Sequence, residues 1–166
     1  MKRSKIIISI IIILLTMSGC NKPSVERTQA NKAYYEYCLI YVDIFNPKKI
    51  PEDWNMKRIE YLTSNNFEVK YEKLKEAVEN YKAVMTDKDK PELETINRHI
   101  DTIDKFIFYA KKFNELGIKT NDEIFTKMTD EERLGYAGAE TSMKITYDAM
   151  LEIIDVWNKS TPVYVD

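Results

Sequence analysis

The chain has few of the residues that build most catalytic and cofactor sites. It contains one histidine, two cysteines and four glycines in 166 residues. The di-iron site usual in helical proteins needs two Glu-x-x-His pairs, and a structural zinc site takes four Cys or His ligands. His99 alone supports neither site, and so few glycines do not build a Gly-rich phosphate loop. We therefore expect no cofactor and no bound metal.

The sequence also lacks a basic run after its first five residues. The chain has 25 Lys and Arg against 27 Asp and Glu, and residues 1–19 carry three of the basic residues and no acidic one. The remainder therefore has a net charge of −5. Nucleic-acid binding needs clustered basic side chains that neutralise phosphates. We expect no nucleic-acid partner.

Apolar runs long enough to span a membrane are missing as well. A helix needs roughly 20 apolar residues to cross the hydrocarbon core, whereas the apolar run Ile6–Leu15 has only ten residues. It follows the basic segment Met1–Lys5 and precedes the small residues Ser18 and Gly19. A basic start, a short apolar core and small residues at the exit are typical of a cleaved secretion signal.

The exit of this leader, Ser18-Gly19-Cys20, resembles the lipobox of bacterial lipoprotein precursors. Met17 stands where that class usually has leucine. The resemblance implies cleavage before Cys20, acyl chains (palmitate among them) on Cys20, and a lipid anchor on the extracytoplasmic side of the cell membrane. In a host with two membranes it allows the periplasmic face of the outer membrane. The alternative is an uncleaved signal anchor with an incidental cysteine.

Apolar residues after the leader recur at helical spacing rather than strand spacing. Long helices are expected over residues 25–45, 65–85, 91–116 and 130–159, and short helices over 52–63 and 120–128. This pattern predicts an all-α fold, an antiparallel helical bundle of three to four long helices with short connecting helices. The expected organisation is a signal peptide (1–19), a lipidated N-terminus with a short tether (20–33) and a bundle domain (34–166).

Local signals predict where these helices begin and end. Pro47 and Pro51 end the first helix, and Gly117 can supply a left-handed cap to the third. Capping boxes, which mark helix starts, are formed by Asn65 with Glu68, Thr120 with Glu123, and Thr129 with Glu132.

Cys38 and His99 are the remaining residues with catalytic potential. Cys38 is spaced at helical intervals from Tyr34, Tyr41 and Phe45, which predicts a buried thiol that acts as a small apolar group. The alternatives are an intermolecular disulfide through Cys38 and a catalytic Cys38–His99 pair. Because nothing in the sequence fixes their distance, we predict no catalytic residue and a protein that is not an enzyme.

Two groups of residues form a candidate partner or ligand surface. The first is the tyrosine set Tyr34, Tyr35, Tyr37 and Tyr41, since tyrosine suits half-buried contacts. Core packing is the preferred interpretation of this set. The second is Gly135 and Gly138, which interrupt a predicted helix although glycine destabilises helices. They allow either a tight helix crossing or the docking of a ligand or partner.

These observations favour a non-enzymatic interaction or structural module of the cell envelope, which contacts the membrane through Cys20 and another envelope protein or itself. The alternative is a binder of a small apolar or amphipathic ligand between the helices. Its expected lining is aromatic and Met-rich: Tyr34, Tyr41, Phe106, Phe113, Met143 and Tyr147.

Overall fold

The computed structural model describes residues 24–46 and 56–163. Three segments lie outside the described residues: the leader with Cys20 and the following tripeptide to Pro23, residues 47–55, and residues 164–166. The predicted signal peptide, the lipidation site and the predicted breaks at Pro47 and Pro51 therefore belong to the part that is not described.

The described chain is all-α, which confirms the predicted fold class. It contains six α-helices: α2 (Gln29–Ile44), α3 (Met56–Leu62), α4 (Asn65–Val84), α5 (Lys90–Glu115), α6 (Asn121–Lys127) and α7 (Asp130–Lys159). A 3-10 turn, η1 (Asp87–Asp89), connects α4 to α5. The strands β1 (Ser24–Glu26) and β2 (Thr161–Val163) have three residues each.

Side-chain caps fix the starts of the last two helices as predicted. Thr120 and Thr129 each accept a hydrogen bond from the backbone N–H three residues on, and Glu123 and Glu132 accept from the backbone N–H of these threonines. Gly117, just after α5, has φ of 60°, the left-handed conformation expected of it.

The predicted start of α4 was wrong by one residue. Ser64 caps this helix, because its hydroxyl accepts from the Phe67 N–H and its own backbone is extended, while Asn65 is already helical. Serine and asparagine are nearly equal as caps, so their order in the sequence did not show which of the two would take the role.

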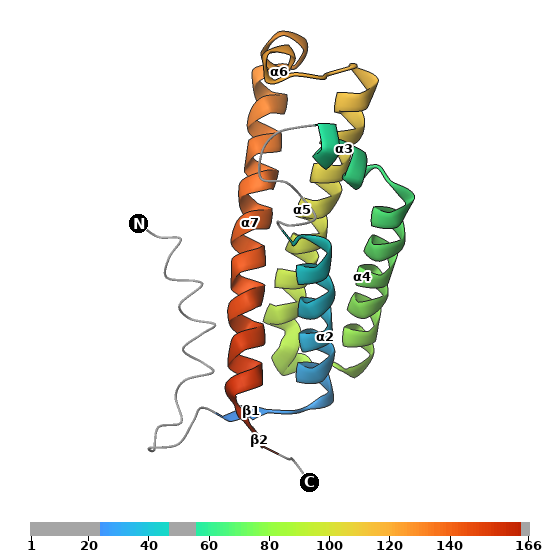
Figure 1. Ribbon diagram of the computed structural model, residues 1–166. Coiled ribbons are helices and arrows are strands. Elements are labelled where there is room, and N and C mark those ends of the chain that lie inside the picture. The colour runs from blue at the N-terminus through green and yellow to red at the C-terminus, as the bar shows by residue number, and fades with distance from the viewer. Residues whose placement is uncertain (1–23, 47–55, 164–166) are drawn as a thin grey trace, which may run out of the picture.

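The four long helices pack around a shared apolar interior. Helix α2 contacts α4 and α7, and α5 contacts α7, so that α2 is covered on two sides (Figure 1). The largest fully buried side chains come from all four helices: Tyr37, Tyr41, Ile44, Phe67, Leu74, Tyr81, Ile96, Ile103, Phe106, Phe113 and Met150.

The first helix begins later than predicted, because residues 24–26 pair with another segment. Strand β1 pairs in parallel with β2, with Val25 opposite Pro162, and the Arg27 N–H donates to the Val163 carbonyl at 3.3 Å. Thr28 then caps α2 by accepting from the Asn31 N–H. The structured part thus includes residues 24–33, which the sequence assigned to the tether.

Two ends of the molecule follow from this pairing. One end, called the strand end below, holds β1, β2, the first turn of α2 and the last turn of α7. Helix α6 lies at the opposite end (Figure 1).

Candidate functional site

The tyrosines of α2 lie mainly in the interior. Tyr37 and Tyr41 are 0% and 1% exposed, and Tyr34 and Tyr35 are partly buried. The rings of Tyr34 and Tyr37 are stacked with centroids 6.2 Å apart, and those of Tyr37 and Tyr41 are also 6.2 Å apart. Tyr37 and Tyr41 therefore pack the core and are not part of a surface.

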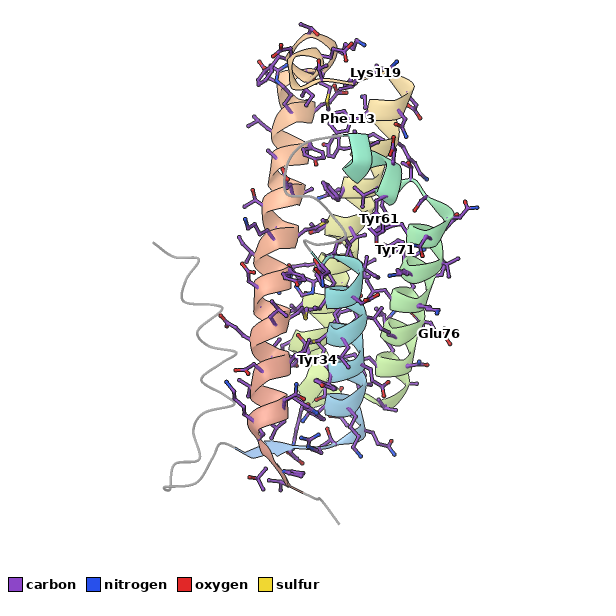
Figure 2. All side chains as sticks on the ribbon, in the orientation of Figure 1. Tyr34, Tyr61, Tyr71, Glu76, Phe113 and Lys119 are labelled. Atoms are coloured by element: carbon purple, nitrogen blue, oxygen red, sulfur yellow. The ribbon has the colours of Figure 1, made fainter. Side chains whose placement is uncertain are left out.

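Tyr34 occupies the boundary between α2, α4 and α5. Its ring lies 5.9 Å from that of Tyr81, and Figure 2 shows it among the helices, whereas Glu76 points outward from α4. Burial, followed by the nearby Cys38 and Glu92, raises the pKa of Tyr34 well above its usual value. Tyr34 therefore stays protonated in the physiological range.

Cys38 is a buried thiol. Its side chain is 0% exposed, and burial raises its pKa well above the usual value for a cysteine. Because the thiolate is the nucleophilic form, a thiol held protonated in the core is a poor nucleophile. Its placement agrees with the packing role expected from its neighbours.

His99 contacts a tyrosine. The His99 Nδ1 lies 3.3 Å from the Tyr37 hydroxyl, and the two rings are stacked. Burial, with a smaller effect from Arg98, lowers the pKa of His99 to about 4. The imidazole is therefore neutral at pH 7, and within the described residues its hydrogen bond is to Tyr37 rather than to Cys38.

Metal-binding clusters and membrane-spanning helices are both absent from residues 24–46 and 56–163. These residues contain no group of three or more His, Cys, Asp or Glu side chains arranged to hold a metal ion. No helix in the same residues is both long enough and apolar enough to cross a membrane.

Gly135 and Gly138 sit on α7 in different environments. A Cβ at Gly135 would overlap the hydroxyl of Tyr109 and lie 2.8 Å from its Cζ, so the absence of a side chain there admits the tyrosine ring from α5. A Cβ at Gly138 would meet nothing within 4 Å. The helix crossing expected of these glycines therefore exists at Gly135, while Gly138 remains open to solvent.

An aromatic clamp at the strand end was not predicted from the sequence. The Arg27 guanidinium carbon lies 4.2 Å from the centre of the Trp157 ring, and the ring of Tyr35 is stacked on Trp157 at 4.8 Å. Arg27 Nη2 also donates to the Trp157 carbonyl at 3.1 Å, and the Tyr35 hydroxyl donates to Asn158 Oδ1 at 3.0 Å. This clamp fastens the start of the described chain to the end of α7. The long sequence separation of its members left no local signal.

The outward side of α7 carries an uncharged surface. We call its five exposed residues the outer α7 strip: Leu134, Ala137, Gly138, Thr141 and Ile145. They follow the i, i+3, i+4, i+7, i+11 pattern of a single helix face. Leu134 is 74% exposed and Ile145 is 51% exposed. This spacing is present in the sequence, but it was not needed to predict the helix. The apolar spacing of the buried face, with Met143 and Met150, was sufficient for that prediction.

The six predicted surface residues are thus not brought together. The tyrosines belong to α2, and Tyr35 lies at the strand end against Trp157. The glycines belong to the N-terminal half of α7, which follows α6. Of the six, Gly138 alone is exposed, and the other five are buried or partly buried. No protein family, no curated protein and no solved structure matches this chain.

Proposed function

We propose that this chain is a lipid-anchored extracytoplasmic lipoprotein whose helical domain is a non-enzymatic interaction or structural module of the cell envelope. The observation that carries the proposal is the leader that ends in Ser18-Gly19-Cys20. Two or three acyl chains on Cys20 would hold the protein to a membrane, since each buried CH2 contributes about 0.8 kcal/mol.

The position of β1 supports the anchoring model. The described chain begins at Ser24, four residues after Cys20. A segment of this length spans at most about 14 Å. The strand end would then lie close to the membrane. The contact of Arg27 with Trp157 would hold the end of α7 near the membrane as well.

The finer architecture that we propose is an antiparallel bundle of α2, α4, α5 and α7. The β1–β2 pairing supports it, because the strands bring the start of α2 to the end of α7. The contact of Tyr109 with Gly135 supports it too, because it joins the second half of α5 to the first turns of α7. Short connections through η1 and α6 agree with neighbouring helices of opposite direction.

The buried state of Cys38 argues against the enzyme alternative, since the proposed nucleophile is shielded from substrate and protonated. The ligand-binding alternative needs an enclosed aromatic cavity. One hollow among the described residues lies on the outer side of α4 and is not that cavity, because none of the aromatic residues predicted for the lining belongs to it: Asn65, Glu68, Val69, Glu72, Lys73, Lys75, Glu76 and Glu79.

The anchor is tested by metabolic labelling with an alkyne fatty acid in a bacterial host. We expect the wild-type chain to carry the label and to fractionate with membranes, and Cys20→Ala to do neither. Cys38→Ala is the matched control and should label like the wild type, because Cys38 is buried. An unlabelled wild-type chain would overturn the proposal.

The interaction role is tested separately, by crosslinking the lipoprotein in its own membranes. We expect a reproducible crosslinked species that contains an envelope protein or a second copy of the chain. A labelled, membrane-bound protein that remains strictly monomeric and uncrosslinked would contradict the interaction role and leave the anchor intact.

A further inference from the structure

We infer that the outer α7 strip is the docking surface of this module, and that its partner is an amphipathic helix of another protein with basic residues at both ends of its apolar face. This inference rests on the proposed interaction role and names the surface and the chemistry of the partner.

The exposure of the strip is the first argument. Leu134 and Ile145 stand more than half exposed on a helix whose opposite side is buried in the core. Between them, Ala137, Gly138 and Thr141 add small uncharged side chains along the same face. Small residues between two larger apolar ones allow the side chains and backbone of a second helix to approach this face closely.

The glycine at position 138 also indicates a docking surface on this face of α7. Glycine inside a helix is unfavourable relative to alanine, and at Gly135 the contact with Tyr109 accounts for it. Among residues 24–46 and 56–163 no comparable contact exists at Gly138, because an added Cβ would meet nothing within 4 Å. The packing of these residues therefore does not need a glycine at this position, whereas close approach of another backbone would.

The charges around the strip identify the partner. Acidic residues on the same face bracket it: Glu131 precedes Leu134 by three residues, and Asp148 and Glu152 follow Ile145 by three and seven. All three are exposed. Lys144 lies about 100° around the helix from Ile145 but borders the strip, because it follows Ala137 by seven residues and is also exposed. A docked helix would thus meet the uncharged residues in the middle and carboxylates at both ends, with Lys144 at one edge.

A second copy of the chain fits these charges poorly. In a parallel pair each acidic residue would face its own copy, so that Asp148 would oppose Asp148. In an antiparallel pair with Leu134 opposite Ile145, Glu131 would oppose Asp148. Both arrangements place like charges together, which disfavours association. Basic residues at both ends of a foreign helix would instead meet opposite charge.

The test uses the lipidated full-length protein in vesicles of neutral phosphatidylcholine, with empty vesicles as the blank. Two labelled helical peptides of about 18 residues serve as probes, long enough to be helical. They share one Leu/Ala face and differ only at their ends, which carry Lys in one peptide and Glu in the other. Binding is measured by fluorescence anisotropy at low and at physiological salt.

We expect the Lys-ended peptide to bind at least about tenfold more tightly than the Glu-ended peptide, and to weaken as salt rises. The double variant Leu134→Ser/Ile145→Ser should lose most of this binding without any change of charge. Leu151→Ser is the matched control, because Leu151 is also an exposed leucine of α7 but lies off the strip. It should bind like the wild type.

Gly138→Gln separates docking from folding. Because a side chain at Gly138 has free space and glutamine favours helix over glycine, the melting temperature should rise while peptide binding falls. A variant that binds less and is more stable cannot be explained by misfolding.

Three results would overturn the inference. The first is equal binding of the two peptides, and the second is unchanged peptide binding by the Leu134→Ser/Ile145→Ser variant. The third is a crosslinked homodimer in vesicles that forms with the wild type but not with this variant. That result would assign the strip to a second copy of the chain. If any of them occurs while Cys20 is lipidated and an envelope partner still crosslinks, the proposed function stands and this surface is the wrong one.

Discussion

The buried face of α2 and the outer face of α7 both look apolar in the sequence, but they meet different surroundings. Tyr37 and Tyr41 are enclosed by α4, α5 and α7, whereas Leu134 and Ile145 face solvent. Apolar spacing alone shows that a face prefers contact. It does not show whether the chain's own fold or another molecule supplies that contact.

The largest expected effect on stability comes from a comparison of two phenylalanines, one in the interior and one on the surface. Phe106 is 1% exposed and Phe108, two positions along α5, is 59% exposed. Phe106→Ala should lower the free energy of unfolding by about 3–5 kcal/mol, because it leaves a cavity against the ring of Tyr136. Phe108→Ala should change it by less than about 0.5 kcal/mol.

Urea unfolding followed by circular dichroism measures both variants. Similar losses for Phe106→Ala and Phe108→Ala would mean that Phe108 is also covered in the folded protein. The described structure would then lack the molecule that covers Phe108 in the complete assembly.

The second prediction concerns the one titrating imidazole in the interior. His99 is neutral when folded, with a pKa of about 4 against about 6.5 for an exposed histidine. Between these two values the unfolded chain binds more protons than the folded one, so stability must fall as the pH is lowered. The expected loss between pH 7 and pH 5 is about 2 kcal/mol.

Urea titrations at pH 7, 6 and 5 measure this loss. This pH range stays above the pKa of Glu123. Hydrogen bonds from the Lys119 backbone and the Lys127 side chain, with a smaller effect from the Thr120 backbone, lower that pKa to about 2. His99→Gln keeps a polar group near Tyr37 but does not titrate, so its stability should vary much less over the same range. An equal pH dependence in wild type and variant would show that another group is responsible.

The sequence predicted the helices well because their signals are local. Capping boxes at Thr120 and Thr129 and the left-handed Gly117 need only neighbouring residues, and all three were confirmed. The Arg27–Trp157 clamp joins residues 130 positions apart, and no local pattern encodes such a contact. The start of α2 was missed for the same reason, since β1 is stabilised by pairing with β2.

The candidate surface was predicted less well than the helices. Tyrosines suit both a core and an interface, so only the packed structure could place Tyr37 and Tyr41 inside. The two glycines carried the same sequence signal, an interrupted helix, and the structure separated them through the position of Tyr109, which the sequence does not fix. Composition thus indicated that α7 is unusual but not which side of it is open.

The smallest expected effect makes the same comparison within a single helix. Gly138→Ala should stabilise the isolated protein by about 1 kcal/mol, because alanine favours helix and its Cβ enters open space. Gly135→Ala gains the same helix propensity but must displace the Tyr109 ring, which packs edge-on against Tyr136 with centroids 6.1 Å apart. We expect it to destabilise the protein by about 1 kcal/mol. Both are measured by thermal and urea unfolding, and a Tyr109→Ala background should remove the difference between them. If the difference persists without the tyrosine ring, the two faces of α7 differ for a reason other than this contact.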